Sequence, residues 1–249
     1  MLTVQRLSRH FGGIKALQQL DLEVRAGEIF ALIGPNGSGK TTLFNVITGV
    51  FPPTEGRIWF QEREITRAKT HRIVKLGIGR TFQTIRLFTH LSVFHNVWVA
   101  LRPAADQGGE HAQRRQRQRV EELLILTRLL DRRDELAGNL NFGEQRRLEL
   151  ARALATSPRL LLLDEPAAGM NSAEVQELIA DIRQLRQMGH TIFLIEHVMD
   201  VVMEVAERIA VLNFGAKIAE GSPAEIQSNS QVIEAYLGKR TIDAAHPGT

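Results

Sequence analysis

The chain has 249 residues, 43% of them hydrophobic, and a formal net charge of +3. This length suits one large domain or one domain with a subdomain, and so small a charge does not by itself indicate a nucleic-acid partner. The absence of cysteine excludes disulfides, thiol catalysis and cysteine metal sites. No apolar run reaches the roughly 18 residues of a membrane span, and residues 1–6 lack the features of a signal peptide.

The first 33 residues are predicted to form strands. Residues 2–7 alternate partly between apolar and polar side chains, and residues 20–24 alternate cleanly, as a half-buried strand does. Residues 28–33 are a short apolar run, which is typical of a buried strand. Phe11 lies in the loop between the first two strands, where its ring could stack on a purine base or simply cover the core.

The stretch after residue 33 fits G-x-x-x-x-G-K-[ST], the phosphate-binding P-loop. Residues 42–48 continue it at helical spacing, so the motif lies between a strand and a helix, as it requires. Glycines let the backbone approach a polyphosphate, and the helix N-terminus attracts the anion. Lys40 is expected to reach the β- and γ-phosphates, and the Thr41 hydroxyl to bind Mg²⁺. The expected phosphate loop comprises Gly34, Pro35, Asn36, Gly37, Ser38, Gly39, Lys40 and Thr41.

The next segments alternate between strand and helix. Residues 57–60 and 77–82 are predicted to be strands, and residues 66–76 to be helical. Gln83 stands at the end of the second of these strands. A polar residue in that position of an α/β protein either faces the ligand crevice or is an ordinary loop residue.

From residue 92 to about 157 the pattern is helical. Ser92 is a suitable N-cap for a helix over 93–101. The basic run at 114–119 is interpreted as a solvated helix face, with phospholipid headgroups or a protein partner as the alternative. A polar, glycine-containing turn at 139–147 opens another helix and offers a second N-terminus that suits an anion.

Four consecutive leucines at 160–163 predict a strand that is buried on both faces. Asp164 and Glu165 follow directly, where two carboxylates are costly without a cation or another partner. Asp164 suits a role in supporting Mg²⁺, and Glu165 suits orienting or deprotonating an attacking water. His197 follows the predicted strand at 191–195, in register with this carboxylate pair.

Together these motifs resemble those of the ATP-binding cassette (ABC) ATPases from Leu2 to about Gly238. The most specific element, residues 140–144 (Leu-Asn-Phe-Gly-Glu), stands where the family has its L-S-G-G-Q signature. The resemblance implies an α/β fold with a mostly parallel sheet core, an antiparallel β subdomain and an α-helical subdomain at about 84–157. The nucleotide-binding domain would span residues 1–238, with a tail at 239–249.

The resemblance also implies roles for single residues. Phe11 would stack on adenine, and Thr42 would join the phosphate loop. Asn141, Gly143 and Glu144 would contact the ATP of a second subunit, with Asn141 in place of the family's serine. Mg²⁺ would be bound by Thr41, Gln83 and Asp164. The catalytic residues would be Lys40, Gln83, the base Glu165 and the switch histidine His197.

Finer motifs resemble those of the ATP-binding subunit of bacterial branched-chain amino-acid importers. They lie at residues 80–83, 86–88, 145–149, 165–171, 195–197 and 235–238. The ATPases of urea importers and lipopolysaccharide exporters are the alternatives. The implied partners are a second ATPase subunit, transmembrane permease subunits and a periplasmic solute-binding protein, with no nucleic acid, at the cytoplasmic face of the bacterial inner membrane.

Other classes fit the sequence less well. A P-loop GTPase would carry an N-K-x-D motif, which is absent. Chromosome-maintenance ABC ATPases carry a long coiled coil between the P-loop and the signature, but residues 42–139 contain no sustained heptads. A non-transport regulatory cassette is the remaining alternative, and the presence of Lys40, Glu165 and His197 argues against it.

Overall fold

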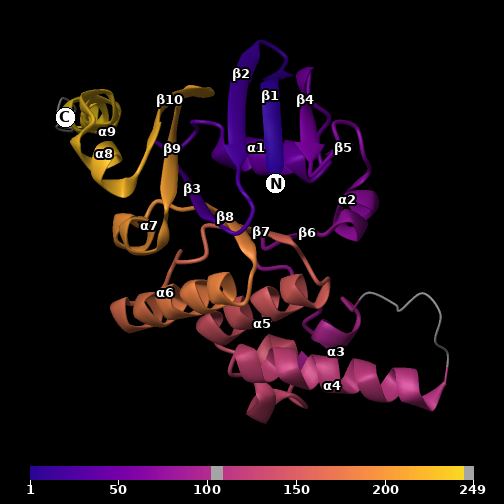
Figure 1. Cartoon of the computed structure of the whole chain (residues 1–249). Helices are drawn as coiled ribbons and strands as arrows, with labels where there is room; N and C mark the ends of the chain where they lie inside the picture. The colour runs from indigo at the N-terminus through magenta and orange to yellow at the C-terminus, as the bar shows by residue number, and fades with distance from the viewer. Residues whose placement is uncertain (102–108, 244–249) are drawn as a thin grey trace.

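The computed structural model describes residues 1–101 and 109–243, with side chains through residue 236. Within this part the strands form two sheets, which Figure 1 shows above and through the middle of the molecule. The four-stranded antiparallel sheet has the order β2-β1-β4-β5. Its strands are β1 (Leu2–Phe11), β2 (Ile14–Val24), β4 (Glu55–Phe60) and β5 (Arg63–Glu64).

The six-stranded sheet has the order β10-β9-β3-β8-β7-β6. All its neighbours pair in parallel except β10, which is antiparallel to β9. Its strands are β3 (Ile29–Ile33), β6 (Ile78–Arg80), β7 (Leu160–Asp164), β8 (Thr191–Ile195), β9 (Arg208–Asn213) and β10 (Ala216–Gly221). A mostly parallel core with an antiparallel subdomain is the predicted α/β fold.

The central strands are buried on both faces, as their apolar runs predict. Phe30 of β3 faces the core beneath the antiparallel sheet, which it shares with helix α1 (Lys40–Ile47). There the ring centroids of Phe30 and Phe44 lie 5.3 Å and 4.9 Å from that of Phe193. The alternate residues of β3 face a second core with helices α6 (Ser172–Gln187) and α7 (Met199–Val205). Burying both faces positions the strand ends, where the polar residues follow.

The helices α3 (Val93–Trp98), α4 (Glu110–Leu126) and α5 (Phe142–Ala155) lie at the end of the molecule away from the antiparallel sheet (Figure 1). Short 3-10 turns at Leu130–Arg132 and Ala137–Asn139 connect α4 to α5. Ser92 caps α3 as predicted, because its hydroxyl accepts a hydrogen bond from the His95 N–H. Residues 102–108 of the predicted helical subdomain lie outside the described residues.

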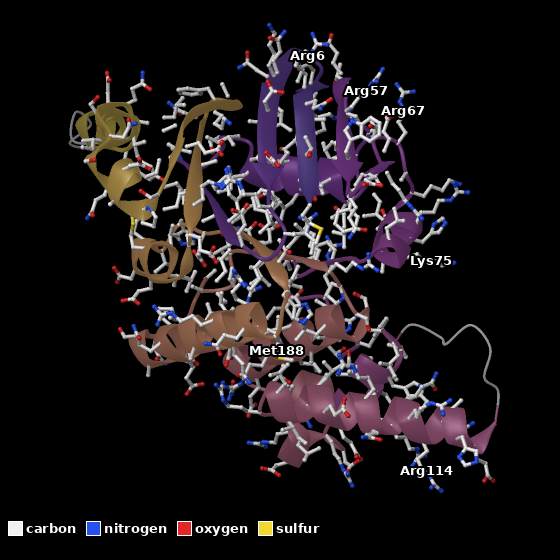
Figure 2. All side chains as sticks on the ribbon, in the orientation of Figure 1. Arg6, Arg57, Arg67, Lys75, Arg114 and Met188 are labelled. Atoms are coloured by element: carbon white, nitrogen blue, oxygen red, sulfur yellow. The ribbon has the colours of Figure 1, made fainter. Side chains whose placement is uncertain are left out.

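The basic run lies on α4, and Arg114, Arg115, Arg117 and Gln118 are exposed, as predicted for a solvated helix face, whereas Gln116 and Arg119 are half-buried. Arg114, labelled in Figure 2, points away from the body of the molecule. The buried side of the same helix carries Val120, Leu123 and Leu124. Among the described residues, no helix has both the length and the apolar character needed to cross a membrane.

Several boundaries differ from the predictions. Strand β1 includes Phe11, which was predicted to lie in a loop, helix α3 ends at Trp98 and not at residue 101, and β6 ends at Arg80 and not at residue 82.

Two further boundaries also differ from the predictions. Helix α2 (Thr70–Leu76) begins later than residue 66, because Lys69 is extended and the Ala68 N–H closes a turn on the Ile65 carbonyl oxygen. After helix α8 (Pro223–Ser228), helix α9 (Ser230–Asp243) continues past residue 238 into the segment predicted as a tail. Residues 244–249 of that tail lie outside the described residues.

Candidate functional site

The P-loop joins β3 to α1 and requires glycine at two close backbone approaches. Gly34 has φ of +149°, and a Cβ atom there would lie 2.1 Å from the Leu212 carbonyl oxygen. Gly39 has φ of +107°, and its Cβ would lie 2.4 Å from the Ala16 carbonyl oxygen. The loop therefore packs tightly against neighbouring backbone. The first N–H groups of α1, which have no partner within the helix, are left for an anion.

Two side chains make this loop suitable for phosphate. Lys40 Nζ donates hydrogen bonds to the carbonyl oxygens of Gly34, at 2.7 Å, and Pro35, at 3.0 Å. Ser38 Oγ is buried and has no hydrogen-bond partner. A buried hydroxyl without a partner is costly, and a phosphate oxygen could accept its hydrogen bond. The loop thus holds a cation and an unsatisfied donor.

One cleft brings the P-loop together with segments that are distant in the sequence. It is lined by Gly13, Ile14, Lys15, Ala16, Gln18, Asn36, Gly37, Gly39, Lys40, Thr41, Thr42, Gln83, Glu165 and Phe214. Gln83 and Glu165 therefore face the predicted phosphate loop from the ends of β6 and β7.

Phe11 is not among the residues that line this cleft. Its ring packs edge-on against Phe51 with centroids 5.3 Å apart, and Arg9 lies 4.4 Å from the ring centre. The side chain is 37% exposed. A role in stacking on adenine stays a prediction.

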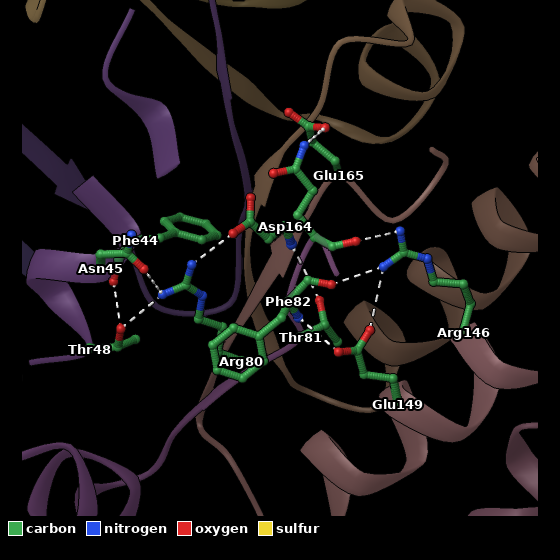
Figure 3. Close-up of polar contacts among 11 residues, drawn as sticks. Phe44, Asn45, Thr48, Arg80, Thr81, Phe82, Arg146, Glu149, Asp164 and Glu165 are labelled. Atoms are coloured by element: carbon green, nitrogen blue, oxygen red, sulfur yellow. Dashed lines mark hydrogen bonds and ion pairs between the residues drawn. The ribbon is translucent and has the colours of Figure 1, made fainter. Parts of the chain in front are cut away.

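Asp164 ends β7 and is completely buried. Its Oδ2 accepts a hydrogen bond from Arg80 at 2.7 Å, which supplies the cation that the sequence argument demands (Figure 3). Its Oδ1 is buried without a hydrogen-bond partner. Burial raises the pKa of the Asp164 carboxyl above its ordinary value, and the hydrogen bond and charge of Arg80 oppose that shift. One oxygen of the carboxylate is thus paired with Arg80, and the other has no hydrogen-bond partner.

Glu165 has a strained backbone and contacts two other predicted catalytic residues. Its φ is +49°, in the left-handed region that non-glycine residues rarely adopt. Its Oε2 accepts a hydrogen bond from Gln83 Nε2 at 2.8 Å and lies 3.7 Å from His197 Nδ1. The ends of β6, β7 and β8 thus bring together Gln83, Glu165 and His197, as their positions after strands predict.

Glu196, which sequence reasoning did not single out, fixes the loops around this group. Its carboxylate is completely buried and accepts hydrogen bonds from three backbone N–H groups. They belong to Ala167 at 2.8 Å, His197 at 2.7 Å and Val198 at 3.0 Å. The loop after β7 and the loop after β8 therefore share one anchor. The sequence signal was the position itself, a carboxylate directly after a buried strand.

The predicted signature residues lie apart from the cleft and open α5. Asn141 Oδ1 accepts from the Glu144 N–H at 2.9 Å, and Glu144 Oε2 accepts from the Asn141 N–H at 3.0 Å. Asn171 and Glu174 repeat this capping box at the start of α6. Asparagine is among the best N-cap residues, so at both positions it satisfies its own helix. In one chain, Asn141, Gly143 and Glu144 do not reach the P-loop cleft.

The cap at Asn141 gives a direct prediction. Asn141→Ala removes the acceptor for the Glu144 N–H and should lower the free energy of unfolding by about 1 kcal/mol. Asn141→Ser keeps an acceptor and should stay within a few tenths of a kcal/mol of the wild type. Chemical denaturation of the three chains measures both values. Equal losses in the two variants would contradict the cap.

Comparison with known proteins places this site in a family. A model of the ABC transporter family matches residues 17–168. The chain belongs to the ABC transporter family. It is an ATPase cassette of that family, and a second model, of branched-chain amino acid ATP-binding cassette transporters, matches residues 216–241.

Named relatives of this ABC ATPase are similar over nearly their whole length. The high-affinity branched-chain amino acid transport ATP-binding protein LivG of Salmonella typhimurium is 42% identical, over 96% of this chain and 98% of that protein. BraF of Pseudomonas aeruginosa, with the same description, is 40% identical over the same shares. The lipopolysaccharide export system ATP-binding protein LptB of Escherichia coli is 34% identical, over 96% and 97%.

Solved structures confirm the fold of this ABC cassette. An ATP-binding cassette of an ABC transporter matches with a TM-score of 0.85 and 30% identity, over 95% of this chain and 98% of that one. A bacterial ABC transporter cassette solved as a dimer matches with a TM-score of 0.80 and 27% identity, over 90% and 99%. A related dimer, bound to ADP and phosphate, has a TM-score of 0.78 and 27% identity, over 90% and 99%.

Proposed function

We propose that this chain is the ATP-hydrolysing subunit of a bacterial branched-chain amino-acid importer, placed at the cytoplasmic face of the inner membrane. The observation that carries the cargo assignment is the match to branched-chain amino acid cassettes at residues 216–241, beyond the general ABC domain. The similarity to LivG and BraF supports it. LptB is less similar, so a lipopolysaccharide exporter is the weaker alternative, followed by a urea importer and a regulatory cassette.

The cleft would hold ATP with its phosphates on the P-loop. The loop N–H groups, Lys40 and the buried Ser38 hydroxyl would contact the phosphate oxygens. Glu165 would take a proton from the attacking water, and Gln83 would orient that water. The two side chains line the same cleft and are hydrogen-bonded to each other, so both could contact one water molecule. His197 would contact the γ-phosphate.

The residues of the site also fit Mg²⁺, which prefers oxygen ligands. The buried, unpartnered Oδ1 of Asp164 is an acceptor that lacks a ligand, and the Thr41 hydroxyl and Gln83 lie in the cleft. When bound, the ion would neutralise charge on the β- and γ-phosphates. Thr41, Gln83 and Asp164 would hold it.

A second ATPase subunit would complete each nucleotide site. Asn141, Gly143 and Glu144 are outside the P-loop cleft of their own chain, so a second chain would have to bring them to the ATP. The dimeric structures of similar cassettes support this pairing. ATP would thus be needed to close the pair, and hydrolysis would allow it to reopen.

The permease subunits would dock at a groove between β6 and α5. Its lining includes Phe82, Arg86, Phe88 and Arg152. Phe88 is half exposed, and Arg152 lies 4.9 Å from its ring centre and donates a hydrogen bond to the Arg86 carbonyl oxygen. Gln83 directly follows Phe82 in the chain and is hydrogen-bonded to Glu165. A partner bound in this groove would therefore act on the proposed catalytic residues. A helical subdomain at about 84–157 would form the far wall, and a periplasmic solute-binding protein would deliver the cargo to the permease.

The test of the proposed cargo is uptake of labelled leucine in source cells that lack the chromosomal copy. Cells complemented with the wild-type chain should take up leucine, and cells with Glu165→Gln should fall to background while urea uptake is unchanged. Glu204→Gln, an exposed change on α7, is the matched control and should restore leucine uptake. Undiminished leucine uptake in Glu165→Gln cells, with no paralogue present, would assign the ATPase to another cargo.

A further inference from the structure

Arg80 lies at the centre of a polar network that the motifs of the nucleotide site do not explain. It is the last residue of β6, and its side chain is only 6% exposed. The guanidinium carbon lies 4.9 Å from the ring centre of Phe82 and 5.5 Å from that of Phe44. An arginine buried between two aromatic rings is held by packing as well as by charge.

The two terminal nitrogens of the guanidinium contact different elements (Figure 3). One nitrogen donates to Asp164 Oδ2 at 2.7 Å. The other donates to Asn45 Oδ1 at 2.8 Å and to Thr48 Oγ1 at 3.0 Å. Asn45 belongs to α1 and Thr48 ends it. Arg80 therefore ties the carboxylate at the end of β7 to the helix that the P-loop opens.

The position of the α1 contacts matters because of helical spacing. Thr41, Asn45 and Thr48 are separated by four and three residues, so they lie along one face of α1. Arg80 binds Asn45 and Thr48, which lie on the same helix face as Thr41. Its contacts thus set the position of Asp164 relative to Thr41, and these are two of the three residues proposed to bind Mg²⁺.

The two oxygens of the Asp164 carboxylate differ in their contacts, which supports the same role for Arg80. Arg80 occupies Oδ2, whereas Oδ1 is buried with no hydrogen-bond partner. A carboxylate fixed through one oxygen presents the other in a defined direction, as the outer-shell partners of metal ligands do. Replacing Arg80 with a neutral residue would remove the hydrogen bond that orients the Asp164 carboxylate and the cation that balances its charge.

We propose that Arg80 is a positioning residue for the metal: it fixes Asp164 Oδ1 relative to the Thr41 face of α1. This inference rests on the proposed function, because it takes Asp164 and Thr41 as ligands of the Mg²⁺ that accompanies ATP. Arg80 does not line the P-loop cleft, so its proposed action on the ion is indirect, through Asp164. Its loss should weaken the contribution of Mg²⁺ to binding and leave the metal-free contacts of the nucleotide intact.

The experiment measures ATP affinity of the purified full chain by calorimetry, with Mg²⁺ and with EDTA. The quantity compared is the ratio of the two dissociation constants, the magnesium increment. Arg80→Met should keep its EDTA affinity within about twofold of wild type and lose about tenfold of the increment, as outer-shell substitutions do. Arg80→Lys, which keeps a cation but not the planar fork, should recover part of it. Arg67→Met, an exposed change labelled in Figure 2, is the control and should match wild type.

Two further variants make every outcome decisive. Asn45→Ala keeps the Arg80–Asp164 pair and removes a tie to α1, so it should lower the increment even if Arg80→Met does not fold. A wild-type increment in Asn45→Ala and in any folded Arg80→Met would overturn the inference. Asp164→Asn tests the underlying assignment: if it too keeps the full increment, the proposed metal role of Asp164 fails. If the magnesium increment is lost in Asp164→Asn but retained in Arg80→Met, only the role of Arg80 is refuted.

Discussion

Replacement of Glu165 with glutamine is expected to reduce ATP hydrolysis by about 10²–10⁴-fold, the usual effect of removing a general base. Glutamine has nearly the same shape and can still bond to Gln83, which lies 2.8 Å from the carboxylate. It cannot accept the proton of the attacking water. The affinity for MgATP should therefore remain close to that of wild type. Phosphate release at saturating MgATP measures the first value, and calorimetry measures the second.

The matched control for this variant is Glu204→Gln on α7. The Glu204 side chain is 53% exposed and pairs with Arg183 at the surface, so it makes the same chemical change far from the cleft. Its turnover should equal that of wild type. Turnover of Glu165→Gln within about threefold of wild type would exclude Glu165 as the base, since that role carries at least a hundredfold. Loss of ATP binding would instead indicate that Glu165 holds the cleft together.

Much of the site could be predicted because its signals are local. A glycine-rich loop between a strand and a helix, and polar residues directly after buried strands, are visible in short stretches of sequence. The carboxyl ends of adjacent parallel strands meet at one edge, so Gln83, Glu165 and His197 could be expected to converge. The β6-β7-β8 order and the contacts of Glu165 confirm that convergence.

The partners of Arg80 could not be predicted in this way. Its contacts lie 84, 35 and 32 residues away, at Asp164, Asn45 and Thr48. Residues 80–83 form one of the motifs that resemble the importer ATPases, but that resemblance does not show whether the Arg80 side chain is buried or which groups it contacts. Only the pairing of β6 with β7, which sets Arg80 opposite Leu162, brings it within reach of Asp164. The cost of burying Asp164 predicted that a cation was needed, but not which one.

Glu196 is a different kind of omission. The argument that a carboxylate after a buried strand needs a partner applies to it as fully as to Asp164. The sequence argument assigned a function to the neighbouring His197 and not to Glu196. The partners of Glu196 are backbone N–H groups of two loops, and backbone donors leave no residue-type signal. Burial cost is thus a guide to which carboxylates matter, but it does not identify the donors.

Arg146→Met is expected to lower the free energy of unfolding by about 3 kcal/mol, the cost of breaking a buried ion pair. The side chains of Arg146 and Glu149 on α5 are only 7% and 6% exposed. Arg146 donates to the carbonyl oxygens of Phe82, at 2.9 Å, and Gln83, at 2.8 Å. Glu149 accepts from the Phe82 N–H at 3.1 Å. Burial raises the pKa of the Glu149 carboxyl, and the Phe82 N–H and Arg146 oppose the shift. Methionine would leave that carboxylate and both carbonyl groups without their cation (Figure 3).

A second substitution separates the charge from the packing. In Arg146→Met/Glu149→Gln the amide oxygen can still accept from Phe82, but no buried charge is left unpaired. About half of the lost stability should return, because an unpaired buried charge accounts for much of the penalty. Arg183→Met, which breaks an exposed pair with Glu204, should cost less than about 1 kcal/mol. Chemical denaturation measures all three chains, and a cost for Arg146→Met as small as that for Arg183→Met would show that the pair is not structural.

The consequence for catalysis follows from where α5 begins. Its first residues form the turn at Asn141–Glu144 that the proposed second subunit would contact, and Arg146 lies within one turn of them. The Arg146 side chain also donates a hydrogen bond to the backbone carbonyl oxygen of Gln83, and the side-chain amide of Gln83 donates to Glu165. A movement of α5 would therefore be transmitted to the catalytic group through two hydrogen bonds. Arg146→Met/Glu149→Gln, which should recover part of the stability but not the hydrogen bond to the Gln83 carbonyl oxygen, should accordingly hydrolyse ATP more slowly than wild type at equal nucleotide occupancy. Wild-type turnover in that double variant would show that Gln83 is positioned by its own strand alone.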